Sequence, residues 1–400
     1  MHRHEKEFPH NQSVEGFVAS FKHTRLSGAL TALYSNRILQ QVASGLIGIF
    51  FPILLYTKFD FSIYAVALYY FINWTLWFFT VPIGAKIMSR IGLKYSLIFS
   101  VMIGWAWYYF VRLFEMHGIL AFLGLAIIVV NFDRMLYWVP YHTSFAEFTD
   151  RRTRGKQMSF LISIASIVSI AIPFISGQII SQYGYDVLFI IALVLYVMSV
   201  IPLFLMPSIK ENFSFGYFET FKKVFCKKNR KMLLAYAADG MQGMVGMVIW
   251  PIFIWLLLDK DYSSVGLVAS LIIVTSLFLR LIMGNLADRF DKRRVLKWGA
   301  LLSAIGWMVK MFVQSGFQIF VASTYHSFAT IVMRTPFDAL MYEKAADSGH
   351  YVDEYTVIRE MCLTFGRLLM LGIICLIFFL TGSFILAFFV AGLASLVVSV

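Results

Sequence analysis

Apolar residues follow one another in blocks of about twenty along most of the chain, and short polar or basic segments separate the blocks. A helix needs roughly 20 apolar residues to cross the roughly 30 Å hydrocarbon core of a bilayer. The pattern therefore predicts an all-α protein with twelve transmembrane helices. We expect these helices at residues 34–56, 62–86, 95–114, 118–141, 157–182, 186–206, 232–258, 262–284, 295–314, 317–340, 355–380 and 383–400.

The composition agrees with this pattern and argues against the soluble classes of protein. Of the 400 residues, 60% are hydrophobic and 14% are charged, whereas soluble domains have roughly 45–50% apolar and about 25% charged residues. The cysteines, Cys226, Cys362 and Cys375, are scattered without metal-binding or disulfide spacing. The sequence also lacks a phosphate-binding loop, so it predicts neither an enzyme nor a bound cofactor.

The net charge of +12 would suggest nucleic-acid binding in a soluble protein. In a membrane protein it indicates orientation instead, because cytoplasmic loops concentrate Lys and Arg. With the N-terminus inside, roughly 25 of the 34 basic residues lie on the cytoplasmic side. The other side keeps Lys58, Arg112, Lys260 and Lys310. We therefore expect both termini in the cytoplasm, insertion in the cytoplasmic (inner) membrane, and no nucleic-acid partner.

An internal repeat divides the predicted helices into two sets of six. Three matches share an offset of 199 residues: Phe51-Pro52 with Trp250-Pro251, Arg90 with Arg289, and Lys94 with Arg293. Repeats of this kind are typical of membrane transporters built from two related halves. The expected divisions are a cytoplasmic segment at 1–33, a six-helix bundle at 34–206, a basic linker at 207–231 and a second bundle at 232–400.

The segment after the eighth predicted helix carries a family motif. Residues 284–294 (GNLADRFDKRR) are similar to the G-x-L-A-D-R-x-G-R-K-R signature of the major facilitator superfamily, with Asp291 in place of the second glycine. The copy at residues 85–94 keeps that glycine as Gly92 but has Ser89 in place of the acid. The resemblance implies a monomer of two pseudo-symmetric six-helix bundles that works by alternating access.

The motif residues are candidates for a gate on the cytoplasmic face. A glycine at a helix end allows two backbones to approach closely, and an Asp–Arg pair beyond it can exchange partners when the bundles move. We assign this role to Gly284, Asp288, Arg289, Arg293, Arg90 and Lys94. The alternative is that the basic residues only anchor the topology.

Ionisable residues at membrane depth cost about 2.5–3.5 kcal/mol on insertion scales, so each suggests a function. Asp133 and Arg134 in the fourth predicted helix are neighbours and point about 100° apart on a helix. At least one of them therefore needs a partner elsewhere. We expect Asp133 to bind a proton or cation, and Arg134 to tune it or to hold an anionic substrate. An ion pair within the bundle is the alternative.

The seventh predicted helix contains Asp239 in a glycine-rich stretch (DGMQGMVG), whose small residues permit close packing and local helix breaking. With Gln242, and with Gln40 and Gln41 at the corresponding place in the first helix, Asp239 would line a cavity for a polar substrate. A capped carboxylate near the cytoplasm is the alternative.

Four further residues within the membrane are candidates. Arg334 and Asp338 are four residues apart in the tenth helix and are expected to pair with each other. Arg367 in the eleventh helix has no adjacent acid, so we expect it to pair with Asp239 or an anionic substrate. Asn73 could line a cavity, whereas most aromatic residues around it are expected to face lipid or to pack.

Together these features predict a secondary active transporter that resides in the lipid bilayer, binds a small-molecule substrate and is coupled to protons. A resemblance of residues 173–177 (PFISG) to the fifth-helix motif of antiporters favours export. Three alternatives remain open. They are a facilitative or symport uptake carrier, a transporter-like sensor without transport, and a membrane-embedded transferase.

Overall fold

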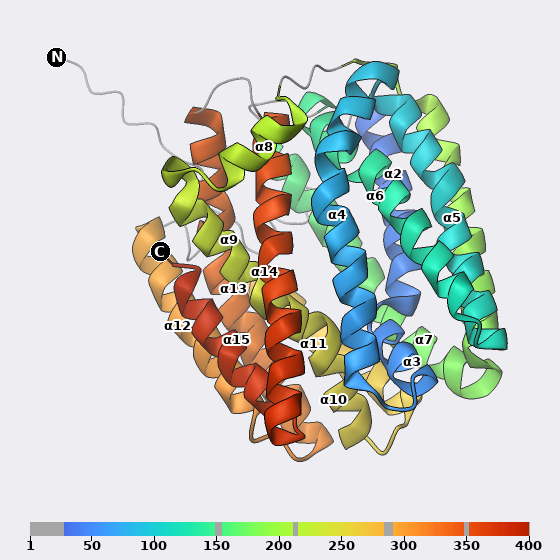
Figure 1. Ribbon diagram of the computed structural model, residues 1–400, viewed down its shortest axis with the longest axis vertical. Coiled ribbons are helices and arrows are strands. Elements are labelled where there is room, and N and C mark those ends of the chain that lie inside the picture. The colour runs from blue at the N-terminus through green and yellow to red at the C-terminus, as the bar shows by residue number, and fades with distance from the viewer. Residues whose placement is uncertain (1–27, 149–153, 211–214, 284–290, 348–351, 400) are drawn as a thin grey trace.

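The computed structural model describes residues 28–148, 154–210, 215–283, 291–347 and 352–399. Within these residues the chain is helical, with no strand, and its helices form two bundles side by side (Figure 1). The first bundle contains α2 (Gly28–Gly48), α3 (Phe51–Lys58), α4 (Ile63–Ile91), α5 (Leu93–His117), α6 (Leu120–Phe148) and α7 (Arg154–Met198). The second contains α9 (Arg230–Met244), α10 (Trp250–Leu257), α11 (Tyr262–Met283), α12 (Lys292–Lys310), α13 (Gly316–Asp347), α14 (Val352–Thr381) and α15 (Ile385–Val397).

The number of membrane-spanning helices follows from these elements. Within the described residues, eight helical segments have the length and hydropathy of a membrane span. One of these segments contains α7, which turns at Gly184 (φ 78°, ψ 177°) and so holds two of the predicted spans. The three others are α12, α13 and α15, which are shorter or more polar and pack together in the second bundle. The prediction of an all-α fold with twelve helices in two bundles is confirmed.

The repeat found in the sequence recurs in the backbone. The first and seventh spans both restart at a proline-containing turn, because α3 begins at Phe51 and α10 at Trp250, each with a proline in its first turn. The turns after these helices hold the four described non-glycine residues with positive φ: Asp60, Phe61, Asp259 and Lys260. The second pair lies 199 positions after the first. The same unusual turn at the same place in each half indicates that the two halves share one fold.

Two helix pairs make the most extensive contacts between the bundles, α4 with α14 and α7 with α11, while α3 with α10 and α6 with α14 touch over smaller areas. The first pair joins the second span to the eleventh, and the second pair joins the fifth span to the eighth. The second span corresponds to the eighth in the repeat, and the fifth to the eleventh. A two-fold axis between the halves therefore converts one pair into the other. Gly177 of α7 and Gly266 of α11 lie at the second crossing, and a Cβ on either would collide with the backbone carbonyl oxygen of Tyr262 or Pro173, respectively. The missing side chains therefore let the two backbones touch. Pro173 and Gly177 belong to the sequence segment that favoured export.

Aromatic side chains of the two bundles meet at the end of the molecule that holds α3 and α10, which is the lower end in Figure 1. Phe61 stacks on Trp255 with ring centroids 6.5 Å apart, and Phe50 meets Tyr262 at 6.2 Å. The ammonium of Lys260 lies 4.9 Å from the centroid of the Phe61 ring. We call this the closed end of the molecule.

The basic linker between the bundles contains the short helix α8 (Tyr217–Val224), although the sequence predicted only a loop. The Tyr217 hydroxyl donates a hydrogen bond to the carbonyl oxygen of Phe79 in α4 (3.1 Å). Phe225 meets Phe365 of α14 with ring centroids 5.8 Å apart. The linker thus contacts both bundles at the end opposite the closed end, which we call the linker end (Figure 1).

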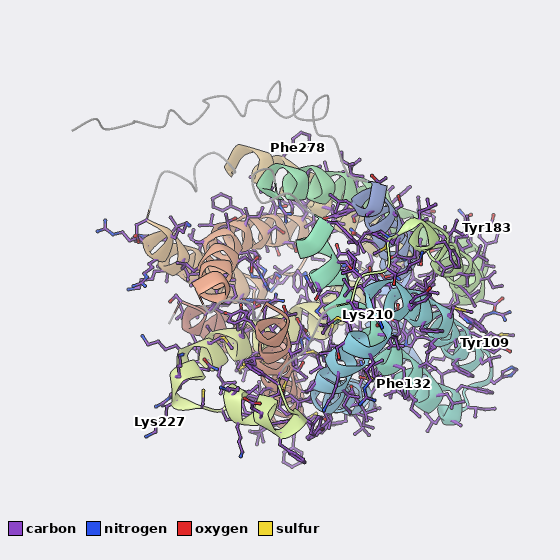
Figure 2. All side chains as sticks on the ribbon, turned by 90° about the horizontal axis from the view of Figure 1, so that it is seen from above. Tyr109, Phe132, Tyr183, Lys210, Lys227 and Phe278 are labelled. Atoms are coloured by element: carbon purple, nitrogen blue, oxygen red, sulfur yellow. The ribbon has the colours of Figure 1, made fainter. Side chains whose placement is uncertain are left out.

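Large apolar side chains cover the outside of both bundles. Tyr109, Phe132, Tyr183 and Phe278 project from the rim (Figure 2) and are between 39% and 65% exposed. An exterior of this kind matches the hydrocarbon of a bilayer rather than water.

The glycine crossing of α7 and α11 gives a stability prediction. We expect Gly266→Leu to destabilise the protein by about 1–3 kcal/mol, since overpacking forces two backbones apart. Gly124→Leu in α6 makes the same change where a Cβ would meet nothing within 4 Å, and it serves as the control. Thermal unfolding of both variants in detergent checks this, and equal unfolding temperatures would contradict the role of the crossing.

Candidate functional site

Asp133 and Arg134 in α6 face different neighbours, so they do not form a simple ion pair. The Asp133 carboxylate accepts a hydrogen bond from the Tyr196 hydroxyl of α7 (2.7 Å) and lies against Gly104 of α5. Asp133 is therefore held among α5, α6 and α7, inside the first bundle.

Arg134 points instead toward α4 and the second bundle. Its Nη1 donates to the Asn73 side-chain oxygen (3.3 Å), which also accepts from the Asn131 amide (3.0 Å). The guanidinium lies 4.8 Å from the centroid of the Trp74 ring. Arg367 of α14 lies 4.0 Å from the same ring. Two guanidinium groups from opposite bundles thus share one indole.

Asp239 of α9 is the acid that pairs with Arg334 of α13. Arg334 Nη2 donates to Asp239 Oδ1 over 2.7 Å, and the Gln242 amide donates to the same oxygen over 3.1 Å. This corrects the expectation that Arg334 pairs with Asp338 four residues along its own helix. The pairing with Asp239 connects two helices that the sequence could not place together. The Asp239 side chain is 2% exposed and that of Arg334 is 39% exposed, so the arginine is the accessible partner.

Gln242 joins three helices of the second bundle. Besides its bond to Asp239, its side-chain oxygen accepts from the Trp307 indole nitrogen (3.3 Å) and from the Ser395 hydroxyl (2.6 Å). The chain beyond it passes through a π-helical turn at Val245–Ile249, so the predicted break in the glycine-rich stretch is present there.

The two glutamines of α2 do not share one environment. Gln41 donates to the Ser169 hydroxyl (2.6 Å) and to the Ala165 carbonyl oxygen of α7 (3.3 Å), within the first bundle. Gln40 is buried, and its amide nitrogen has no hydrogen-bond partner among the described residues. Neither residue lines the cavity described next.

A cavity of about 410 Å³ lies against the second bundle and reaches the first through Ile49, in the turn between α2 and α3, and Pro173 of α7. Its polar and charged lining comes from α9, α12 and α13, whereas isoleucines of α10 and α11 form an apolar wall. The lining side chains with polar or aromatic groups are Gln242, Trp250, Trp307, Lys310, Ser323, His326, Ser327, Thr330 and Arg334.

Lys310 lies in the cavity and not, as the sequence predicts, in a loop on the outer surface. It is only 3% exposed, because the last turn of α12 directs it into the cavity. Its ammonium lies 4.3 Å from the ring centroids of both Trp250 and Trp307 and 2.9 Å from His326 Nδ1. Sequence reasoning counted Lys310 as a loop charge because it stands at the end of an apolar segment.

The predicted gating residues lie at the linker end or outside the described residues. Gly284, Asp288 and Arg289 fall outside them. Arg293 and Arg90 are exposed, and the Lys94 ammonium donates to the Phe204 carbonyl oxygen (2.8 Å).

The departure of this chain from the family motif has a local explanation. Asp291 is the N-cap of α12, and its carboxylate accepts a hydrogen bond from the backbone N–H of Arg294 (2.9 Å). Gly92 holds the same position in the first half, with φ 85°, before α5. Asp and Gly are both favoured as N-cap residues. The second copy of the motif therefore begins its helix with a side-chain cap from Asp291, and the first copy begins its helix with Gly92.

We compared the sequence with protein-family models and with curated proteins. No protein-family model matches the chain. Among curated proteins, the uncharacterized protein YqgE of Bacillus subtilis (strain 168) is 21% identical over 249 residues, which cover 60% of this chain and 57% of that protein.

Two solved structures of transporters match nearly the whole chain. FucP, described as a major facilitator superfamily transporter in the outward conformation, matches with a TM-score of 0.64 and 13% identity over 92% of this chain and 96% of its own. The peptide transporter POT in complex with alafosfalin matches with a TM-score of 0.70 and 10% identity over 97% of both chains. This chain has the fold of the major facilitator superfamily transporters.

Proposed function

We propose that the protein is a secondary active transporter that moves a small polar solute across the cytoplasmic membrane by alternating access, coupled to protons. One observation carries the proposal. Arg334 lines a cavity that both bundles contact, and it is held there by a buried carboxylate, Asp239. A solute in the cavity and a proton on Asp239 would therefore act on the same guanidinium.

The orientation of the cavity follows from the distribution of charge. Cytoplasmic loops concentrate Lys and Arg, and the linker end carries six basic residues between positions 222 and 231. We therefore place the linker end in the cytoplasm and the closed end outside. In the proposed cycle the aromatic contact of Phe61 with Trp255 would have to part when the cavity opens to the exterior.

The contacts between the bundles suit a rocking motion. Arg367 and Trp74 meet through a cation–π contact at 4.0 Å, which has little directional demand compared with a hydrogen bond. The indole retains Arg134 of its own bundle when Arg367 moves away. The joint between α4 and α14 can therefore open without leaving the Trp74 ring unpartnered.

Competition for Arg334 would couple the solute to protons. A solute group that accepts hydrogen bonds from Arg334 displaces Asp239, and a displaced carboxylate at this depth is stabilised by taking up a proton. Solute and proton therefore bind together and cross in the same direction. This favours the symport alternative over export, which the resemblance of residues 173–177 had favoured.

Asp133 is less suited to this role than the sequence indicated. Its carboxylate is bound to Tyr196 inside the first bundle, away from the residues that line the cavity. We assign proton coupling to Asp239 and a structural role to Asp133.

Asp239→Asn gives the sharpest test of coupling. In proteoliposomes given a small-molecule cell extract and an inward proton gradient, the wild type should accumulate a solute, by up to about tenfold per pH unit if one proton accompanies it. The variant should lose this accumulation but keep exchange of the same solute, since Asn still accepts a hydrogen bond from Arg334. Mass spectrometry of the lumen measures both quantities.

Asp133→Asn is the matched control, because it neutralises another acid at membrane depth without touching the cavity. We expect it to retain gradient-driven accumulation. Loss of accumulation in this variant alone would move the proton site to Asp133. A wild-type protein that binds a component of the extract but never moves it would contradict transport and favour the sensor alternative.

A further inference from the structure

Lys310 stands at the centre of a basic and aromatic group that the coupling mechanism does not use. We define the lysine pocket as Trp250, Trp307, Lys310, Ser323 and His326, which all line the cavity. The pocket unites residues from α10, α12 and α13.

The Lys310 side chain is held by aromatic and imidazole groups, and no acid pairs with it among the described residues. The two indole rings at 4.3 Å stabilise an ammonium through their faces, and His326 accepts a hydrogen bond from it through Nδ1 when that atom is unprotonated. Among the described residues, no carboxylate lies within ion-pair distance of Lys310. Such a cation within a membrane normally pairs with an acid.

Ser323 supplies an independent sign of a missing partner. It is 5% exposed, and its hydroxyl has no hydrogen-bond partner among the described residues. Ser323 and His326 are three residues apart on α13 and so share a face. Buried hydroxyl groups are nearly always hydrogen-bonded, so the cavity that Lys310 lines also has an open donor and acceptor in Ser323.

The rest of the cavity lining favours a particular ligand chemistry. The titratable residues that line it are Lys310, His326 and Arg334, with no Asp or Glu among the described lining residues. Ile254, Ile272 and Ile273 provide an apolar wall. The volume of about 410 Å³ lies within the range of small-molecule sites.

We infer that the solute is a small organic anion with an apolar or aromatic body. Its anionic oxygen atoms accept hydrogen bonds from Lys310 and Ser323, and its body packs against Trp250 and the isoleucines. This inference rests on the proposed function and names the substrate class. Ser323 and Arg334 lie eleven residues apart on α13, roughly 16 Å along a helix, so the group that competes with Asp239 for Arg334 is a second polar group of the same solute.

Binding of charge-matched probes tests the inference in phosphatidylcholine nanodiscs, which contain no anionic lipid. The probes are benzoate, phenyl phosphate and benzenesulfonate, with benzamide and benzylammonium as neutral and cationic controls. We expect at least one anion to quench tryptophan fluorescence saturably and to raise the unfolding temperature. Benzamide and benzylammonium should bind at least about tenfold more weakly, because they lack the charge-assisted hydrogen bonds.

Variants at two lysines separate the pocket from general charge effects. Lys310→Met should weaken anion binding by about tenfold or more, and Lys310→Arg should restore most of it. Lys260→Met removes a lysine that also lies near aromatic rings, at the closed end, and should leave binding unchanged. Met is close to Lys in size, so Lys310→Met should leave no cavity. The unfolding temperature measured without ligand verifies that each variant is folded.

Three results would overturn the inference: no saturable binding of any anion, equal binding of benzamide, or unchanged binding to a folded Lys310→Met protein. None of these results would contradict proton-coupled transport, because the Asp239→Asn transport assay detects the accumulated solute whatever charge that solute carries. Conversely, if anions bind but the wild type accumulates no solute from the extract, the anion site at the lysine pocket is supported and the proposed transport function is contradicted.

Discussion

Charged groups inside the hydrocarbon region must find their partners within the protein, and this constraint organises the centre of the molecule. Each such group left unpaired costs about 2.5–3.5 kcal/mol or more. Arg334 is held by the carboxylate of Asp239. Arg134 and Arg367 share the ring of Trp74 from opposite bundles.

These partnerships differ in how easily they change. An ion pair with one buried and one accessible member can be broken by a solute that replaces the buried member. A guanidinium on an indole can slide across the ring at small cost because the contact has weak directionality. The first arrangement lies at the cavity and the second lies between bundles, which is where a transporter needs chemical selectivity and mechanical freedom, respectively.

The sequence predicted those features of the fold that depend on local pattern. Apolar blocks gave twelve helices, and the offset between Phe51-Pro52 and Trp250-Pro251 anticipated two matching helix breaks, which the positive-φ turns after them repeat. Gly177 was noticed as part of a motif, but its contact with α11 depends on how two distant helices cross, which no local pattern encodes.

The candidate site was harder to predict, because it depends on which face each helix turns to the cavity. Arg334 was assigned to Asp338 by helical spacing, yet Asp239 of another helix is its partner. Trp74 was one aromatic residue among many, and only the structure sets it between two arginines. Lys310 was counted with the loops, although the last turn of α12 buries it.

The account depends most on the closed end opening as the bundles rock. Spin labels at Ile119→Cys and Phe312→Cys would report this, since both positions are exposed, lie in turns of opposite bundles and form no part of the aromatic closure. With Cys226, Cys362 and Cys375 replaced, pulsed electron resonance in nanodiscs should give two distance populations. Acidification in the presence of the small-molecule cell extract, whose solute displaces Asp239 in the proposed mechanism, should change their ratio in the wild type but not in Asp239→Asn. A single distance that is the same at every pH would contradict alternating access.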